Sequence, residues 1–140
     1  MFASRAHVIA VEHAKRLSTK LKRAYEDFES PPRLPELLKT ANAFYKINPR
    51  TSYLIATDVS ENYEAKEIGA GAVIVTPPTE KPLYVTKNST NVFLLNAKYK
   101  MQEFDWVAKR SMCDIELVVS AMVLAHLEDR LRRHNAFKGL

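Results

Sequence analysis

Four short runs of sequence decide the fold class: SYLIATD at residues 52–58, GAGAVIVT at 69–76, PLYVTK at 82–87 and NVFLL at 91–95. Each run is rich in β-branched or aromatic residues and is bounded by turn residues, as short strands are. The connections between the last three runs are too short for crossovers, so we expect an antiparallel meander. Gly69 and Gly71 predict a bulge or a close backbone approach, and the polar residues 60–67 predict a solvated loop.

Two helices are expected before these strands. Residues 4–29 carry a heptad-like apolar seam, in which the members lie three or four residues apart: Ala10, Ala14, Leu17, Leu21, Ala24 and Phe28. Pro31 and Pro32 end this helix, because proline lacks a donor and disfavours helical geometry in the residue before it. Pro35 suits the first turn of a second helix over residues 36–46.

Two further helices are expected after the strands. A helical pattern begins at about Ala97, and a new helix over residues 112–134 is marked by Ser111 and Asp114, which resemble a capping box. This last helix is apolar almost all round between residues 115 and 127, so it should be the most buried element. We expect it to pack on the sheet through Leu117, Val118, Ala121 and Leu124. The chain thus reads as one α+β domain, residues 1–140, with two N-terminal helices, about four antiparallel strands and two C-terminal helices.

Composition bounds the class of protein. With 140 residues and 46% hydrophobic residues the chain can build one core. Its single cysteine, Cys113, excludes an intramolecular disulfide and is expected to be buried. There is no apolar run of roughly 18 residues that could span a membrane, and the N-terminus lacks the apolar core of a secretory signal. We therefore expect a protein of the cytoplasm or of an assembled particle, without a membrane partner.

The formal net charge of +5 is concentrated near the two ends of the chain. Clusters of this kind could meet nucleic-acid phosphate, an acidic protein partner or only solvent. The candidate residues for binding nucleic acid or a partner are Lys15, Arg16, Lys20, Lys22, Arg23, Arg130, Arg132 and Arg133.

Few residues suggest a catalytic, cofactor-binding or metal-binding role. The four histidines, His7, His13, His126 and His134, show no ligand spacing, and the run from Gly69 to Ala72 lacks the lysine and spacing of a phosphate loop. We expect no catalytic residue, no cofactor and no metal site.

One order of elements resembles the first half of the ribonuclease-H-like fold: a strand ending in Asp58, two further strands, and a helix with the early glutamate Glu116. The resemblance covers about residues 52–130. It implies that the two carboxylates share divalent ions that activate water for phosphodiester cleavage. Since the segment between Asp58 and Glu116 holds an extra strand and helix, such a nuclease remnant is the second alternative.

The leading hypothesis is a non-enzymatic structural subunit of a larger assembly, such as a viral particle component or a ribonucleoprotein subunit. Its partners would be itself, other protein subunits or both. Residues 1–30 could protrude as an assembly helix, because the helix precedes a Pro-Pro break and has a regular seam. The expected oligomer interface is Ala10, Ala14, Leu17, Leu21 and Phe28. The first alternative is a nucleic-acid-binding module that uses the basic terminal helices.

Overall fold

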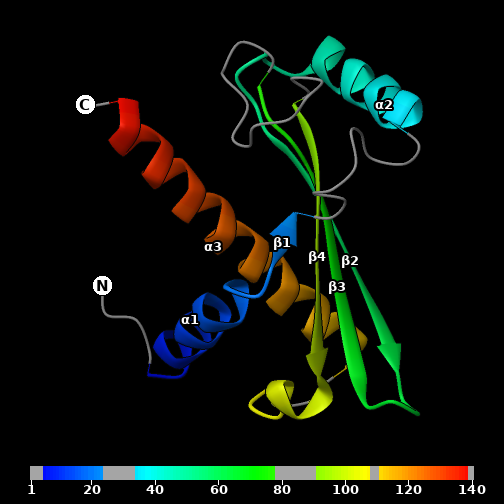
Figure 1. Ribbon diagram of the computed structural model, residues 1–140, viewed down its shortest axis with the longest axis vertical. Helices are drawn as coiled ribbons and strands as arrows, with labels where there is room; N and C mark the ends of the chain where they lie inside the picture. Colours follow the sequence, from blue (N-terminus) through cyan, green and yellow to red (C-terminus); the bar gives the residue numbers. More distant parts are fainter. Residues whose placement is uncertain (1–4, 24–33, 78–90, 108–110, 139–140) are drawn as a thin grey trace.

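The computed structural model describes residues 5–23, 34–77, 91–107 and 111–138 (Figure 1). Along these residues the helices and strands are α1 (Arg5–Ser18), β1 (Lys22–Arg23), α2 (Leu34–Ile47), β2 (Leu54–Asn62), β3 (Glu67–Val75), β4 (Val92–Lys100), the 3₁₀ helix η1 (Met101–Phe104) and α3 (Met112–Lys138). The expected α+β class is confirmed. Within the described residues it consists of three α-helices and an antiparallel sheet of three long strands, to which the two-residue β1 adds.

The sheet has the order β1-β4-β3-β2, and every neighbouring pair is antiparallel. The register is unbroken from Leu54↔Val75 to Asn62↔Glu67, and β3 pairs directly with β4 from Glu67↔Lys100 to Val75↔Val92. A meander that places residues 82–87 between these strands is therefore wrong, and residues 82–87 themselves lie outside the described part of the chain. The predicted bulge is wrong too, since the pairing runs straight through Gly69 and Gly71.

The β2–β3 connection is a tight hairpin rather than the solvated loop expected over residues 60–67. β2 continues to Asn62, and the turn closes with Asn62 Oδ1 accepting the N–H of Ala65 at 3.1 Å. Lys66 completes the turn with φ 54°, a left-handed conformation that is uncommon outside glycine. The sequence suggested a loop because Ser60 and Asn62 are polar. In the structure they are strand residues on an exposed face of the sheet, where polar side chains are also expected.

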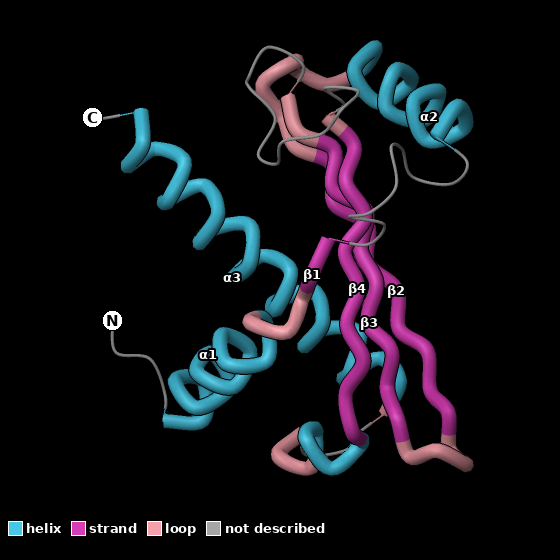
Figure 2. The backbone as a smooth tube through the Cα atoms, viewed as in Figure 1, coloured by secondary structure: helices cyan, strands magenta, loops and turns pink. Residues whose placement is uncertain are grey.

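The two faces of the sheet are covered unequally. α1 and α3 lie on one face, while α2 lies only over the end of the other face that contains Val75 (Figure 2). On the first face, alternate residues of β3 are buried in the main core, which follows from the two-residue period of a strand: Ile68, Ala70, Ala72 and Ile74. On the second face, Ala41 of α2 packs with Val75 and Val92.

α1 ends at Ser18, so the helix expected over residues 4–29 is wrong in length. The Ser18 and Thr19 hydroxyls donate to the carbonyls of Lys15 and Arg16 at 2.6 and 2.7 Å. Such side-chain bonds compete with the helical ladder, and the backbone tightens into three-residue steps such as Leu21 N–H to Ser18 O, at 3.1 Å. Lys22 and Arg23 then pair with β4. The apolar spacing continues through Leu21 because this residue is still buried, although it is no longer helical.

The region that begins at Ala97 is a strand, not the expected helix. β4 runs to Lys100, with Tyr99 buried and its neighbours Lys98 and Lys100 on the other side of the strand. Among the described residues that follow β4 and precede residue 108, residues 101–104 form the 3₁₀ helix η1, which buries Phe104. The positions that suggested helical steps, Met101 and Phe104, are three residues apart, which a short 3₁₀ helix also satisfies.

α3 begins where the sequence predicts. The Ser111 hydroxyl donates to Asp114 Oδ2 at 2.8 Å, and the N–H of Asp114 donates back to Ser111 Oγ at 3.2 Å. This reciprocal capping box satisfies helix donors that would otherwise lack a partner. The helix expected over residues 36–46 is likewise present as α2.

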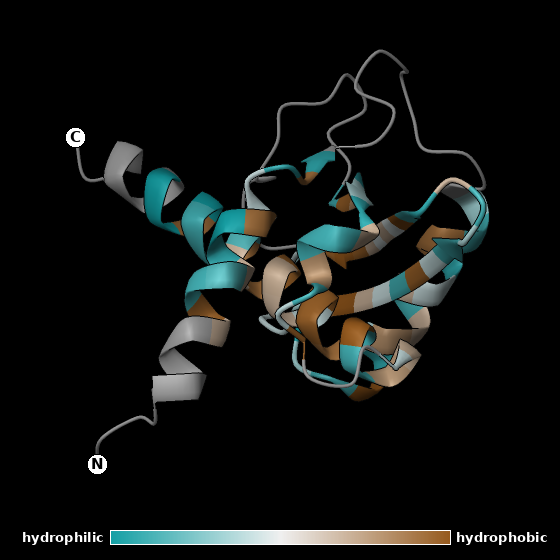
Figure 3. Ribbon diagram, turned by 90° about the horizontal axis from the view of Figure 1, so that it is seen from below, coloured by the Kyte–Doolittle hydropathy of each residue, from teal (hydrophilic) through white to brown (hydrophobic). Residues whose placement is uncertain are grey.

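The buried face of α3 differs from the expected one. Its core residues are Ile115, Val119, Met122, Val123 and Leu127. Val118 packs partly against the core, but Leu117 is 70% exposed, Leu124 is 56% exposed and Ala121 is also exposed. We call Leu117, Ala121 and Leu124 the α3 outer stripe. Figure 3 shows the hydrophobic residues gathered where the helices meet the sheet, while α3 becomes hydrophilic toward its C-terminal end.

Candidate functional site

A cleft of about 400 Å³ lies between the end of α1 and the second half of α3. Ala14 and Leu17 of α1 pack in the main core together with Val119 and Val123 of α3. This packing holds the two helices side by side, and the cleft lies between them. We call it the α1–α3 cleft. The charged and titratable side chains that line it are Lys15, His126, Glu128, Asp129, Arg130, Arg132 and Arg133.

The lining of the α1–α3 cleft is predominantly cationic, with four basic and two acidic side chains. Arg132 pairs with Glu128 at 2.6 Å and Arg133 pairs with Asp129 at 3.1 Å, both one turn apart on α3. All four of these side chains are more than half exposed. Exposed pairs of this kind are worth at most about 1 kcal/mol. They can therefore hold the guanidinium groups in place without preventing them from binding another anion.

His126 lies half-buried in the wall of the cleft. Burial of the imidazole lowers the pKa of His126, and the positive charges of Arg130 and Arg133 lower it further. The negative charge of Asp129 acts in the opposite direction. The ring is therefore neutral at pH 7. It gives the cleft a polar group whose charge depends on pH.

The structure brings together half of the basic residues proposed from the sequence. Lys15, Arg130, Arg132 and Arg133 share the cleft, although they come from opposite ends of the chain. The other members of the N-terminal cluster lie elsewhere.

Arg16 turns away from the cleft, since its Nη2 lies 2.9 Å from Nδ1 of His13, and the ring of His13 stacks on Trp106 with centroids 4.5 Å apart. Lys20 pairs with Glu103 of η1 at 3.4 Å. Lys22 is exposed on β1. Arg23 also belongs to β1, but its side chain lies outside the described part of the chain.

The oligomer interface proposed on the first helix is not at a free surface. Ala14, Leu17 and Leu21 are buried in the main core of the same chain, and Ala10 is half-buried. Phe28 lies outside the described residues. The seam is regular because it packs against the core of its own domain, and this corrects the expectation of a protruding assembly helix over these positions.

The α3 outer stripe was missed by reading the sequence. Leu117, Ala121 and Leu124 follow one another at four and three residues, so they share one side of α3, opposite Val119 and Val123. A helix that is apolar all round has a second apolar face besides the one that packs in the core. The apolar stretch between residues 115 and 127 was therefore the signal in the sequence for this stripe.

The carboxylates of the ribonuclease-H-like resemblance do not converge. The Thr57 hydroxyl lies 3.1 Å from the Ser120 hydroxyl of α3, so Thr57 faces the helix that carries Glu116. Asp58 is the next residue of the strand and therefore points to the opposite face of the sheet, where its Oδ1 accepts the N–H of Val59 at 2.9 Å. Among the described residues, no three His, Cys, Asp or Glu side chains gather as a metal ion would need.

Cys113 is exposed at the start of α3, which corrects the expectation that it is buried. The side chains of His7 and His134 lie outside the described part of the chain. Within that part, no helix combines the length and the apolar character that crossing a membrane requires.

Comparison of the chain with protein-family models, with curated proteins and with solved structures gives no match. The function is therefore argued from the geometry and charge of the chain itself.

Proposed function

We propose that this protein binds nucleic acid through the α1–α3 cleft. The observation that supports the proposal is that basic residues from two distant parts of the chain, Lys15 and the group at 130–133, line one cleft. Neutralised phosphates release condensed counterions, so clustered cations of this kind are the electrostatic footprint of nucleic-acid binding.

Arginine suits this role because its planar guanidinium can donate two parallel hydrogen bonds to one phosphate. A phosphate entering the cleft would compete with Glu128 for Arg132 and with Asp129 for Arg133. Both pairs are exposed, so the competition costs little. The groups that the cleft offers suit phosphate rather than bases, and we therefore expect binding through the cleft itself to depend weakly on sequence.

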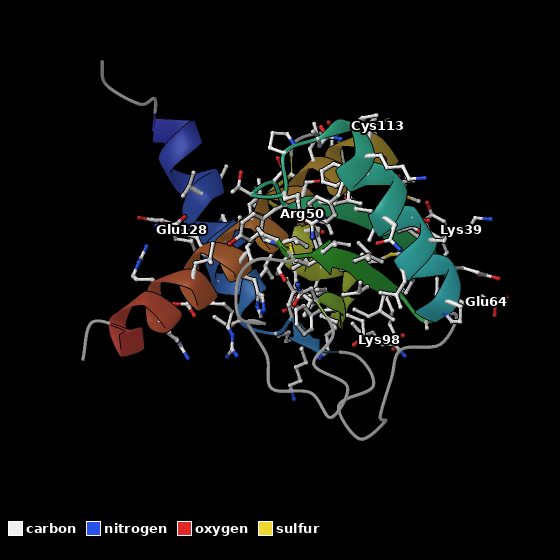
Figure 4. All side chains as sticks on the ribbon, turned by 90° about the horizontal axis from the view of Figure 1, so that it is seen from above. Lys39, Arg50, Glu64, Lys98, Cys113 and Glu128 are labelled. Carbon is white, nitrogen blue, oxygen red and sulfur yellow. The ribbon has the colours of Figure 1, made fainter. Side chains whose placement is uncertain are left out.

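The test is the salt dependence of affinity for single-stranded and duplex oligonucleotides, measured by fluorescence anisotropy. The double variant Lys15→Gln with Arg132→Gln should bind more weakly and should reduce the slope of log K against log salt by about one for each phosphate that is no longer neutralised. The matched control is Lys39→Gln with Lys46→Gln on α2, which removes the same charge. Figure 4 labels Lys39 and Glu128 on opposite sides of the molecule.

The control variant should keep the wild-type slope. An equal loss of affinity in both variants would mean that net charge alone matters, and it would reject the cleft as the binding site.

A second candidate function is a structural subunit of a larger assembly, and the α3 outer stripe supports it. Leu117 and Leu124 are more than half exposed on one side of α3, and a partner protein that buried them would remove this apolar surface from water. Leu117→Asp with Leu124→Asp should leave the domain folded and abolish any oligomer seen by sedimentation. An oligomer that survives this change would exclude the stripe as its interface.

A further inference from the structure

A second hollow lies on the sheet face that α1 and α3 do not cover. It has a volume of about 520 Å³ and is formed by two rows of residues paired across β2, β3 and β4. One row is Asp58–Gly71–Asn96 and the other is Ser60–Gly69–Lys98. We call it the sheet-face groove. Among the described residues, α2 packs on the same face near Val75, at the end of the sheet away from the β2–β3 hairpin (Figure 2).

The dimensions of the groove follow from sheet geometry. Neighbouring strands lie about 4.8 Å apart, so the β2 and β4 walls are about 10 Å apart. Neither inner position of β3, Gly69 or Gly71, has a side chain of its own; the Ser60 hydroxyl lies close over Gly69, so the floor is bare at Gly71. A groove of this shape admits a flat ring that lies over the peptide planes of β3.

The two glycines have different explanations. A Cβ on Gly69 would lie 2.6 Å from Ser60 Oγ, so close packing accounts for glycine there. A Cβ on Gly71 would meet nothing nearer than the Leu95 carbonyl oxygen at 3.9 Å, which is ordinary contact. Glycine weakens a strand interior, and packing against the described residues does not require it at Gly71. What it does provide there is the open floor of the groove.

The two walls differ in chemistry. The β2 wall presents the Asp58 carboxylate and the Ser60 hydroxyl, and the N–H of Val59 uses one lone pair of Asp58 Oδ1. The β4 wall presents the Asn96 amide and the Lys98 ammonium. Lys98 pairs with Glu67 at 3.6 Å, but its side chain is 75% exposed and the pair is weak. A ligand that fits both walls donates hydrogen bonds on one side and accepts them on the other.

We propose that the sheet-face groove binds a guanine base. Guanine donates from N1 and from its exocyclic N2 amino group, which suits the carboxylate of Asp58. It accepts at O6 and N7, which are the atoms that lysine side chains contact in guanine recognition. Adenine lacks the N1–H donor, so it would place an acceptor against Asp58. The base could come from a free nucleotide or from an unpaired residue of a nucleic acid, and the groove is separate from the α1–α3 cleft.

The experiment is a titration of the ¹⁵N-labelled protein with guanosine, inosine and adenosine, followed by NMR shifts of the Gly71 and Asn96 amides. Guanosine should shift both amides, and inosine, which lacks the N2 amino group, should bind about tenfold more weakly. No shifts with guanosine at millimolar concentration, or equal binding of adenosine, would overturn the proposal.

The decisive variant is Gly71→Val, because it places a side chain in the groove at a position where an added Cβ meets no atom nearer than 3.9 Å. Valine suits a strand better than glycine, so the melting temperature should stay the same or rise while guanosine binding is lost. The matched control is Ala56→Val, an exposed position of β2 that does not line the groove. Wild-type binding by a folded Gly71→Val protein would reject the site.

A last pair of probes separates the two sources of the base. An oligoribonucleotide with one unpaired guanine that binds more tightly than guanosine, and loses this advantage in Gly71→Val, assigns the groove to nucleic acid. Equal or weaker binding of the oligonucleotide assigns it to a free nucleoside or nucleotide. Oligonucleotide binding that Gly71→Val leaves unchanged, together with no binding of guanosine, would refute guanine recognition here.

Discussion

Tyr99 joins three parts of the molecule through one buried side chain. Its hydroxyl donates to the Leu17 carbonyl at the end of α1 at 2.6 Å, and its ring meets Phe104 edge-on with centroids 5.6 Å apart. Burial and the nearby charge of Glu103 raise the pKa of Tyr99 well above its usual value, so the phenol stays protonated and able to donate.

We expect Tyr99→Phe to destabilise the domain by about 1 kcal/mol, the usual net worth of one internal hydrogen bond. The loss should not be larger, because the N–H of Lys20 still donates to the Leu17 carbonyl at 3.2 Å. Urea unfolding followed by circular dichroism measures it. A variant as stable as wild type would mean that this bond does not hold the end of α1.

His126 should make stability depend on pH. Its pKa is lowered in the folded protein, so the unfolded chain takes up the proton first as the pH falls. The contribution of His126 is full above pH of about 6.5, the unfolded pKa, and is lost as the pH falls through the folded pKa. We expect wild type to lose more stability between pH 7.5 and 5.5 than His126→Gln does. Identical pH profiles of the unfolding free energy would contradict this reading of the cleft.

At the scale of elements, α3 shows which features of a helix the sequence pattern predicts and which it does not. Its start was predictable because Ser111 and Asp114 act within one turn. The buried side of α3 was not predictable, because Leu124 and Val123 both lie on apolar faces of the helix. Contact with the sheet and with α1 decides that Val123 is buried and Leu124 is exposed. The choice depends on the shape of the neighbours and not on the helix itself.

A pair of alanine variants tests which side of α3 is inside. Met122 is fully buried, and Met122→Ala should cost about 2–5 kcal/mol. Leu124 is 56% exposed, and we expect Leu124→Ala to cost less than about 0.5 kcal/mol. Both values come from chemical denaturation of the purified variants. The reverse order of costs would place the α3 outer stripe in the core.

At the scale of the whole molecule, α1 is an integral part of the domain rather than a detachable arm. Leu17 and Leu21 are 2% and 4% exposed and belong to the same core as the sheet and α3. We therefore expect Leu17→Asp with Leu21→Asp to unfold the protein, because two buried carboxylates without partners are costly. Thermal melting is the measurement, and Leu117→Asp with Leu124→Asp is the control of equal chemistry on an exposed face. A cooperatively melting Leu17/Leu21 variant would show that α1 is dispensable.

The sequence by itself determined what depends on neighbouring residues: the α+β class, the strands around Ile55 and Ile74, and the capped start of α3. Tertiary structure decided what depends on contacts between distant residues. α1 stops at Ser18 and the chain then pairs with β4, and Lys15 and Arg132 line the same α1–α3 cleft. The glycines of β3 become the floor of a groove only because β2 and β4 place polar side chains on either side. Local patterns encode period and capping, but which surfaces meet follows from how the elements fit together when they bury their apolar faces.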